Sequence, residues 1–213
     1  MSINAAVELS NAHRAVLAAG PVSTVTVSRT VEAGIEAVWQ ALTDPDQLPG
    51  WFGPAEGDLR EGGDYTLPTN GASGTITRCE RPTNFALTWE SMGQSTTFTA
   101  SLAEHPAGGT QVTLTHVVPG GEHWDRFGPG AVGVAWEGAL LALARFLAGD
   151  PSAAPEEMAH LHEDEQGRAY IEGAARAWGQ AHAAGGGDPE AAAQAAERTA
   201  AFYTGQAAPE DEA

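Results

Sequence analysis

The sequence predicts an α+β protein in which one long apolar helix lies across a curved antiparallel sheet. The helix is residues 128–149, where apolar side chains recur at helical spacing. Pro129 suits its first turn, and Gly149-Asp150-Pro151 ends it. A helix this apolar needs a large partner surface, and the run of short strands before it is the candidate in the sequence. We therefore expect the functional site between helix and sheet.

One stripe of this helix carries its large apolar side chains. Its members follow one another at intervals of three or four residues: Val132, Trp136, Leu140, Leu143 and Leu147. Glu137 and Arg145 lie off this stripe. Regular turn signals between β-branched and aromatic runs predict the sheet. The expected strands are residues 22–28, 64–67, 74–79, 85–89, 96–102 and 110–118.

Composition limits the partners. The chain has 213 residues and a formal net charge of −18, and all ten of its basic residues are arginine. Such a chain offers no basic patch, so nucleic acid and anionic membranes are poor partners. The single cysteine, Cys79, excludes a disulfide framework and favours a reducing compartment. With no apolar core of signal-peptide length near the N-terminus and no membrane-span window, we expect a soluble cytoplasmic protein.

Three regions follow along the chain. Residues 1–20 form an N-terminal segment with some helical potential, and residues 21–150 form the main domain. Within that domain, residues 33–43 predict a helix, and Gly and Pro around Trp51 and Phe52 predict a rigid loop that tucks its rings inward. Residues 151–213 are acidic and alanine-rich, and they predict a helical extension that docks on the main domain or on another subunit.

The order of short motifs resembles a known family. The motifs are VTVSRTV, EAVWQALTDPDQLPGWF, LREGGDY, GTITRCERPTNFALTWE, GTQVTLTHV and VAWEGALLALARFL. Together they resemble the SRPBCC or START-like superfamily, and within it the AHSA1-like branch related to activators of the Hsp90 ATPase. The resemblance covers residues 22–147, and the tail is similar to an extension found on some bacterial members. It implies a helix-grip fold with a cavity between sheet and helix. The sequence has no phosphate loop and no dinucleotide fingerprint, so we expect no cofactor.

Strand alternation assigns the inward-facing residues. Phe85, Leu87 and Trp89 share one face, and His116 is the polar member of an inward row on the last strand. We expect the cavity to bind a small hydrophobic or aromatic ligand. The predicted ligand-binding residues are Trp51, Phe52, Tyr65, Trp89, Phe98, His116, Trp124, Trp136 and Leu140. Residues 122–126, around Trp124, are expected to form a lid loop.

Two alternatives stay open at this point. In an enzyme of the cyclase or hydrolase type, His116 or Tyr65 would perform acid–base work, which needs two or more polar groups converging in the pocket. In a protein-interaction module resembling a chaperone cofactor, the acidic tail would supply the contact. The sequence also leaves homodimer formation open.

Metal chemistry has weak support in the sequence. Glu156, His160 and Glu163 lie at positions i, i+4 and i+7, which suits a helical face, but a solvated acidic helix explains the spacing as well. Cys79 reads as a small strand residue rather than a nucleophile. We therefore predict no metal site.

Overall fold

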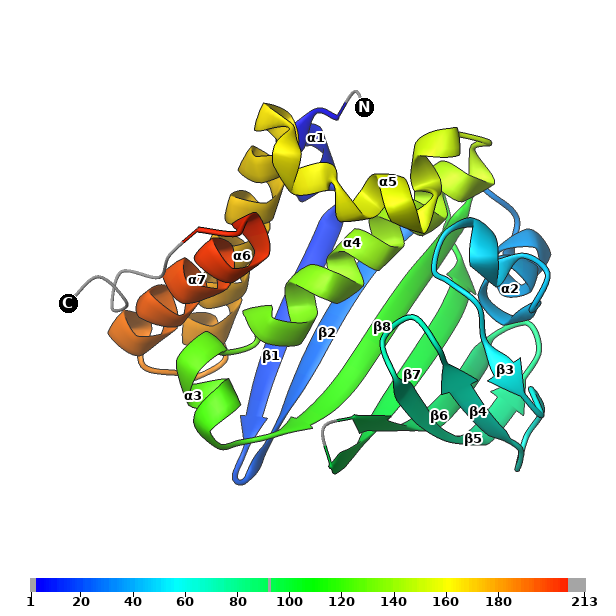
Figure 1. Cartoon of the computed structure of the whole chain (residues 1–213), viewed down its shortest axis with the longest axis horizontal. Coiled ribbons are helices and arrows are strands. Elements are labelled where there is room, and N and C mark those ends of the chain that lie inside the picture. The colour runs from blue at the N-terminus through cyan, green and yellow to red at the C-terminus, as the bar shows by residue number, and fades with distance from the viewer. Residues whose placement is uncertain (1–2, 92, 207–213) are drawn as a thin grey trace. The chain divides into compact units, whose positions relative to one another are not determined.

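The computed structural model of the chain describes residues 3–91 and 93–206, and it confirms the predicted α+β class (Figure 1). Residues 207–213, the end of the predicted extension, lie outside the described part. The strands are β1 (Ala12–Ala19), β2 (Val22–Val31), β3 (Glu56–Gly57), β4 (Asp64–Leu67), β5 (Ala72–Glu80), β6 (Asn84–Ser91), β7 (Gln94–Glu104) and β8 (Thr110–Pro119). The helices are α1 (Ala5–Ser10), α2 (Ile35–Thr43), α3 (Glu122–Phe127), α4 (Gly130–Leu147), α5 (Pro155–Ala159), α6 (Glu165–Ala184) and α7 (Pro189–Thr204).

The strands form one eight-stranded sheet in the order β1-β2-β8-β7-β6-β5-β4-β3. Neighbouring strands from β3 to β8 pair antiparallel, as the regular turn signals predict. Strand β8 alternates between buried and partly buried positions along its whole length, and β5 carries a bulge between Ile76 and Arg78. With the long apolar helix α4, this sheet confirms the helix-grip architecture.

Two segments differ from the expectations. The N-terminal segment is helical at Ala5–Ser10, but Ala12–Ala19 is a strand, because pairing in the sheet overrides the helical propensity of its alanines. The expected loop at residues 122–126 is helix α3, Glu122–Phe127. It starts after Gly121, at φ 126°, and ends at Gly128, at φ 59°.

The chain divides into two compact units. The first comprises the described parts of residues 1–27, 118–138 and 159–213, and the second comprises residues 28–117 and 139–158. Neither assignment tests the sequence-based domain limits at residues 20 and 150, which stay predictions.

Helix α6 is the centre of the first unit. Its buried face consists of Gly167, Tyr170, Ile171, Ala174, Ala175, Trp178 and Gly179. Trp178 lies so close to α4 that a Cβ added at Gly133 would stand 2.4 Å from its ring. A Cβ added at Gly173 would likewise stand 2.4 Å from the Leu9 side chain. Helix α6 therefore packs against both α4 and the N-terminal segment. Helix α6 is thus part of the core of the first unit.

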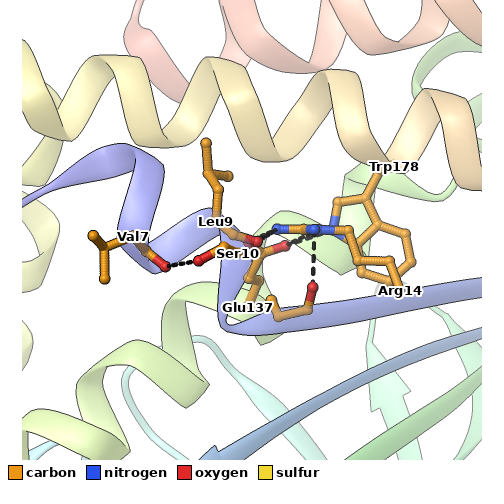
Figure 2. A network of polar contacts seen from close by, with 7 residues as sticks. Val7, Leu9, Ser10, Arg14, Glu137 and Trp178 are labelled. Carbon is orange, nitrogen blue, oxygen red and sulfur yellow. Dashed lines mark hydrogen bonds and ion pairs between the residues drawn. The ribbon is translucent and has the colours of Figure 1, made fainter.

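Glu137 of α4 is buried, although the helical stripe places it away from the large apolar residues. Its side chain is 2% exposed, and it forms an ion pair with Arg14 of β1 (Figure 2). Arg14 Nε donates to one carboxylate oxygen at 2.7 Å, and its terminal nitrogens also donate to the carbonyls of Leu9 and Ala12. Trp178 Nε1 donates to the same carboxylate at 3.2 Å. One carboxylate therefore joins β1, α4 and α6.

Helix α4 has the length and composition of a membrane-crossing helix, since its 18 residues carry few charges. More than half of it, 56%, is nevertheless buried inside the protein. We conclude that α4 is the core helix of a soluble domain.

We expect removal of Glu137 to destabilise the protein strongly. Glu137→Ala leaves the largely covered Arg14 guanidinium, whose side chain is 10% exposed, without its counter-charge. We expect this to cost about 3–5 kcal/mol of unfolding free energy. Urea unfolding at pH 7 measures the loss. The matched control is Glu36→Ala, because Glu36 pairs with Arg81 at a surface where both side chains are about 60% exposed, and such pairs contribute about 0–1 kcal/mol. Equal losses in the two variants would refute a structural role for the buried pair.

Candidate functional site

The register of the sheet brings the centre of the candidate site together in the second unit. Leu87 of β6 lies opposite Phe98 of β7, and Phe98 lies opposite His116 of β8. Directly opposed residues project from the same face of a sheet. Three residues far apart in the chain thus form one row, as the strand alternation predicted for His116.

Aromatic rings continue this row in both directions. Phe98 lies 6.1 Å from His116, 6.2 Å from Trp89 and 6.3 Å from Phe85, measured between ring centroids. Trp89 is 6.0 Å from the His116 ring, and Trp39 of α2 meets Phe85 edge-on at 6.1 Å. These separations are typical of favourable ring pairs. The site is an aromatic surface with one imidazole in it.

His116 is buried and hydrogen-bonded to a threonine. His116 is 5% exposed, and its Nε2 lies 2.8 Å from Thr96 Oγ1. The Thr96 hydroxyl donates to the Trp89 carbonyl at 3.1 Å, so its oxygen is left to accept from the Nε2–H of a neutral imidazole. Burial penalises the charged ring and lowers the pKa of His116 to about 4. His116 is therefore neutral at pH 7.

Tyr65 is committed to a backbone partner. It is buried on β4, and its hydroxyl donates to the Thr88 carbonyl at 2.8 Å. Its ring position is opposite Gly74, where a Cβ would stand 2.0 Å from the same Thr88 oxygen, so the chains approach too closely there for any side chain. Burial raises the pKa of Tyr65, and the charge of Glu90 adds to the effect. A phenol held in this way is a poor proton donor or acceptor for a substrate.

In the loop around Trp51 and Phe52, the first ring is buried and the second is partly buried, so both rings turn inward. Trp51 is buried and donates from Nε1 to the Ala41 carbonyl at 2.9 Å, and its ring is 5.3 Å from Phe52. Phe52 packs into the apolar cluster around Tyr65 that also contains Leu87 and Trp89. The second half of α4 reaches this loop, because a Cβ at Gly50 would stand 2.7 Å from the Phe146 ring.

Seven of the nine predicted ligand-binding residues lie in the second unit, and six of them come from the sheet and the loop before it: Trp51, Phe52, Tyr65, Trp89, Phe98 and His116. Leu140 also belongs to this unit and is fully buried on α4. Trp136 and Trp124 belong to the first unit, where Trp124 packs edge-on against His182 at 5.3 Å. Their part in binding stays a prediction.

Strand β6 is incompletely covered. Its inward residues Phe85, Leu87 and Trp89 are all partly exposed, whereas Phe98 and Ala100 on the neighbouring strand β7 are buried. An apolar face in the middle of a sheet is normally covered by core packing. Phe85, Leu87 and Thr96 were not among the predicted site residues, although the alternation that selected Trp89 and Phe98 also includes them.

The three residues considered for a metal site, Glu156, His160 and Glu163, do not lie on one helix. Glu156 lies on α5, but the chain turns at His160 before the short 3₁₀ helix Leu161–Glu163, so the three residues do not share one helical face. His160 Nδ1 is bonded to Glu163 at 2.9 Å. Within residues 3–91 and 93–206, no group of three histidine, cysteine or carboxylate side chains is arranged to hold a metal ion.

The antiparallel sheet, the long helix and the aromatic face define a helix-grip α+β protein of the kind that the motif order indicated. Residues 32–148 match the family described as Activator of Hsp90 ATPase homolog 1-like protein. Because this match spans more than half of the chain, the protein belongs to the AHSA1 family. No curated protein matches the chain in sequence.

Solved structures extend the likeness beyond the family domain. The crystal structure of CalU16 from Micromonospora echinospora is 32% identical, with a TM-score of 0.62, and the alignment covers 80% of this chain and 97% of that one. The solution structure of CalU16 is 31% identical, with a TM-score of 0.65, and the alignment covers 82% of this chain and 96% of that one. EF2215 from Enterococcus faecalis, at 16% identity and a TM-score of 0.58, covers 80% of this chain and 96% of its own, and it shows the fold alone.

We expect the buried imidazole to make stability depend on pH. The pKa of His116 is about 4 in the folded protein, below the ordinary histidine value of about 6.5, so the unfolded chain binds the extra proton between these values. Stability is thus fully present above pH 6.5 and falls by about 2 kcal/mol between pH 7 and pH 5. Urea unfolding at both pH values measures it.

The variant His116→Gln removes the titrating group, and its loss between pH 7 and pH 5 should be smaller by that amount. His13→Gln is the control, because His13 is exposed on β1. The same loss in His116→Gln as in the wild type would show that His116 titrates normally.

Proposed function

We propose that the protein binds a small hydrophobic or aromatic ligand in a cavity against the inner face of β6, β7 and β8. The observation that carries the proposal is the partly exposed apolar row Phe85, Leu87 and Trp89 at the middle of the sheet. Apolar surface left accessible there gains about 25 cal/mol for each Å² that a ligand covers.

The polar groups support binding rather than catalysis. The imidazole of His116 is neutral and bonded to Thr96, and the hydroxyl of Tyr65 is bonded to a backbone carbonyl. General acid–base work needs a group that reaches the substrate with a pKa near the working pH, and neither of these groups meets both conditions. An uncharged ligand suits an aromatic surface whose histidine is kept neutral.

The compartment follows from the same reasoning. Cys79 is an exposed free thiol on β5, and such a thiol suits a reducing environment. We therefore propose a cytoplasmic location. The net charge of −18 supports a small molecule rather than a nucleic acid as the partner.

We expect thermal shifts with neutral aromatic ligands. A ligand at a hundred times its Kd stabilises the folded state by about 2.7 kcal/mol, which raises the Tm of a chain of this size by about 5–10 °C. Differential scanning fluorimetry with 2-naphthol, a tricyclic aromatic ketone and a saturated fatty acid measures the effect and separates aromatic from aliphatic preference.

The matched pair of variants is Leu87→Trp and Thr97→Trp. Leu87 lies on the partly exposed inner face, so the larger ring fills the space that a ligand would take and should abolish the shift. Thr97 is exposed on the opposite face of β7 and should leave the shift intact. Binding by Leu87→Trp at wild-type strength, or no shift with any of the three molecules, would contradict the proposal.

A further inference from the structure

The joint between α3 and α4, residues 126–131, is held by side chains of the C-terminal helix α7. Arg198 Nε donates to the Arg126 carbonyl at 2.7 Å, and Thr199 Oγ1 donates to the Phe127 carbonyl at 2.8 Å. About one turn further on, the Tyr203 hydroxyl donates to the Ala131 carbonyl at 2.9 Å. Burial raises the pKa of Tyr203 to about 12, so this phenol remains a donor. Three side-chain hydrogen bonds from α7 thus hold the backbone of residues 126–131.

His182, in the last turn of α6, packs against the same joint. Its ring meets Trp124 of α3 edge-on, with 5.3 Å between centroids and 74° between planes. A Cβ added at Gly128 would stand 3.6 Å from its Nδ1, and one added at Gly187 would stand 2.6 Å from its Nε2. Backbone therefore lies close to the imidazole at both ring nitrogens.

The Nδ1 atom of His182 is buried and has no hydrogen-bond partner. An unsatisfied acceptor is tolerable, but a proton at Nδ1 would add a buried donor and a buried charge. Burial accordingly lowers the pKa of His182. The charged and titratable groups on the elements around it are Glu122, His123, Asp125 and Arg126 of α3, Asp188 of the α6–α7 loop, and Glu190, Glu197, Arg198 and Tyr203 of α7. The Asp188 carboxylate is used as the N-cap of α7, where it accepts from the Ala191 N–H.

We infer that the α3–α4 joint is a proton-sensitive latch, in which neutral His182 holds Trp124 and the joint closed and protonated His182 releases α3. An imidazolium needs partners for both N–H groups. The ring reaches water by leaving the contact with Trp124 and Gly128. Gly121 and Gly128, both at positive φ, flank α3 and are the positions where the backbone can turn. Release of α3 also opens the bonds from Arg198 and Thr199 to the Arg126 and Phe127 carbonyls.

The direction of the pH dependence follows from the two forms. In the released form His182 has an ordinary pKa of about 6.5, and in the closed form its pKa is lower. Between these two values the released form binds more protons, so the ratio of released to closed molecules rises up to about tenfold for each unit that the pH falls.

Hydrogen exchange followed by mass spectrometry tests the latch on the full chain. Peptides covering residues 122–131 are compared at pH 7 and pH 5 after correction for the intrinsic exchange rate. We expect protection to fall in the wild type and to stay constant in His182→Phe, which keeps the ring contact with Trp124 but cannot titrate. The matched control is His123→Phe, because His123 is an exposed ring on α3, 5.1 Å from Phe127. This control should respond to pH as the wild type does.

Constant protection in the wild type overturns the latch, and so does an unchanged response in His182→Phe. A second measurement on the wild type needs no folded variant at residue 182. The indole N–H resonance of Trp124, assigned with Trp124→Phe, should titrate with the same midpoint as the His182 ring. Different midpoints would show that another group controls the Trp124 environment, and they would overturn the latch. The latch shares only Trp124 with the predicted ligand-binding residues, and the proposed site on β6, β7 and β8 does not depend on Trp124, so either proposal can fail alone.

Discussion

A carboxylate buried within an apolar helix is the constraint on which the first unit depends. Glu137 cannot remain charged inside the protein without partners, since isolated buried charge is costly by several kcal/mol. Arg14 from β1 and Trp178 from α6 supply three donors, and Arg14 in turn satisfies two carbonyls of its own segment. Residues more than 160 positions apart in the chain are thereby fixed on one helix. The C-terminal helices are part of this core.

In the second unit, the buried His116 is accommodated in a different way. His116 lies among aromatic rings and meets a threonine instead of an opposite charge. The arrangement keeps the imidazole neutral, and a neutral ring leaves the surrounding aromatic face suited to uncharged molecules. Glu137 needs a charged partner to remain in the interior, whereas His116 remains there by losing its charge. Glu137 therefore has a structural role, and in the proposed ligand site a neutral His116 would be a group that an uncharged ligand lies against.

Much of the fold and part of the site follow from local sequence patterns. The spacing of Trp136, Leu140 and Leu143 predicted the long helix, and strand alternation placed His116 with Phe98 on one face. The same alternation contains Thr96 and Leu87, so the sequence was sufficient to predict that these two residues share the inner face. The strand Ala12–Ala19 was not, because its alanines favour a helix and only pairing in the sheet reverses that preference.

By itself, the sequence determined the α+β class, the antiparallel meander, the family and the inward position of the aromatic residues. These depend on periodicity and turn chemistry, which act over a few residues. The tertiary structure decided the burial of Glu137, its pairing with Arg14, the bond between Thr96 and His116, and the meeting of His182 with Trp124. Each of these joins residues at least twenty positions apart, and the free energy of a buried polar group depends on partners that local sequence does not specify.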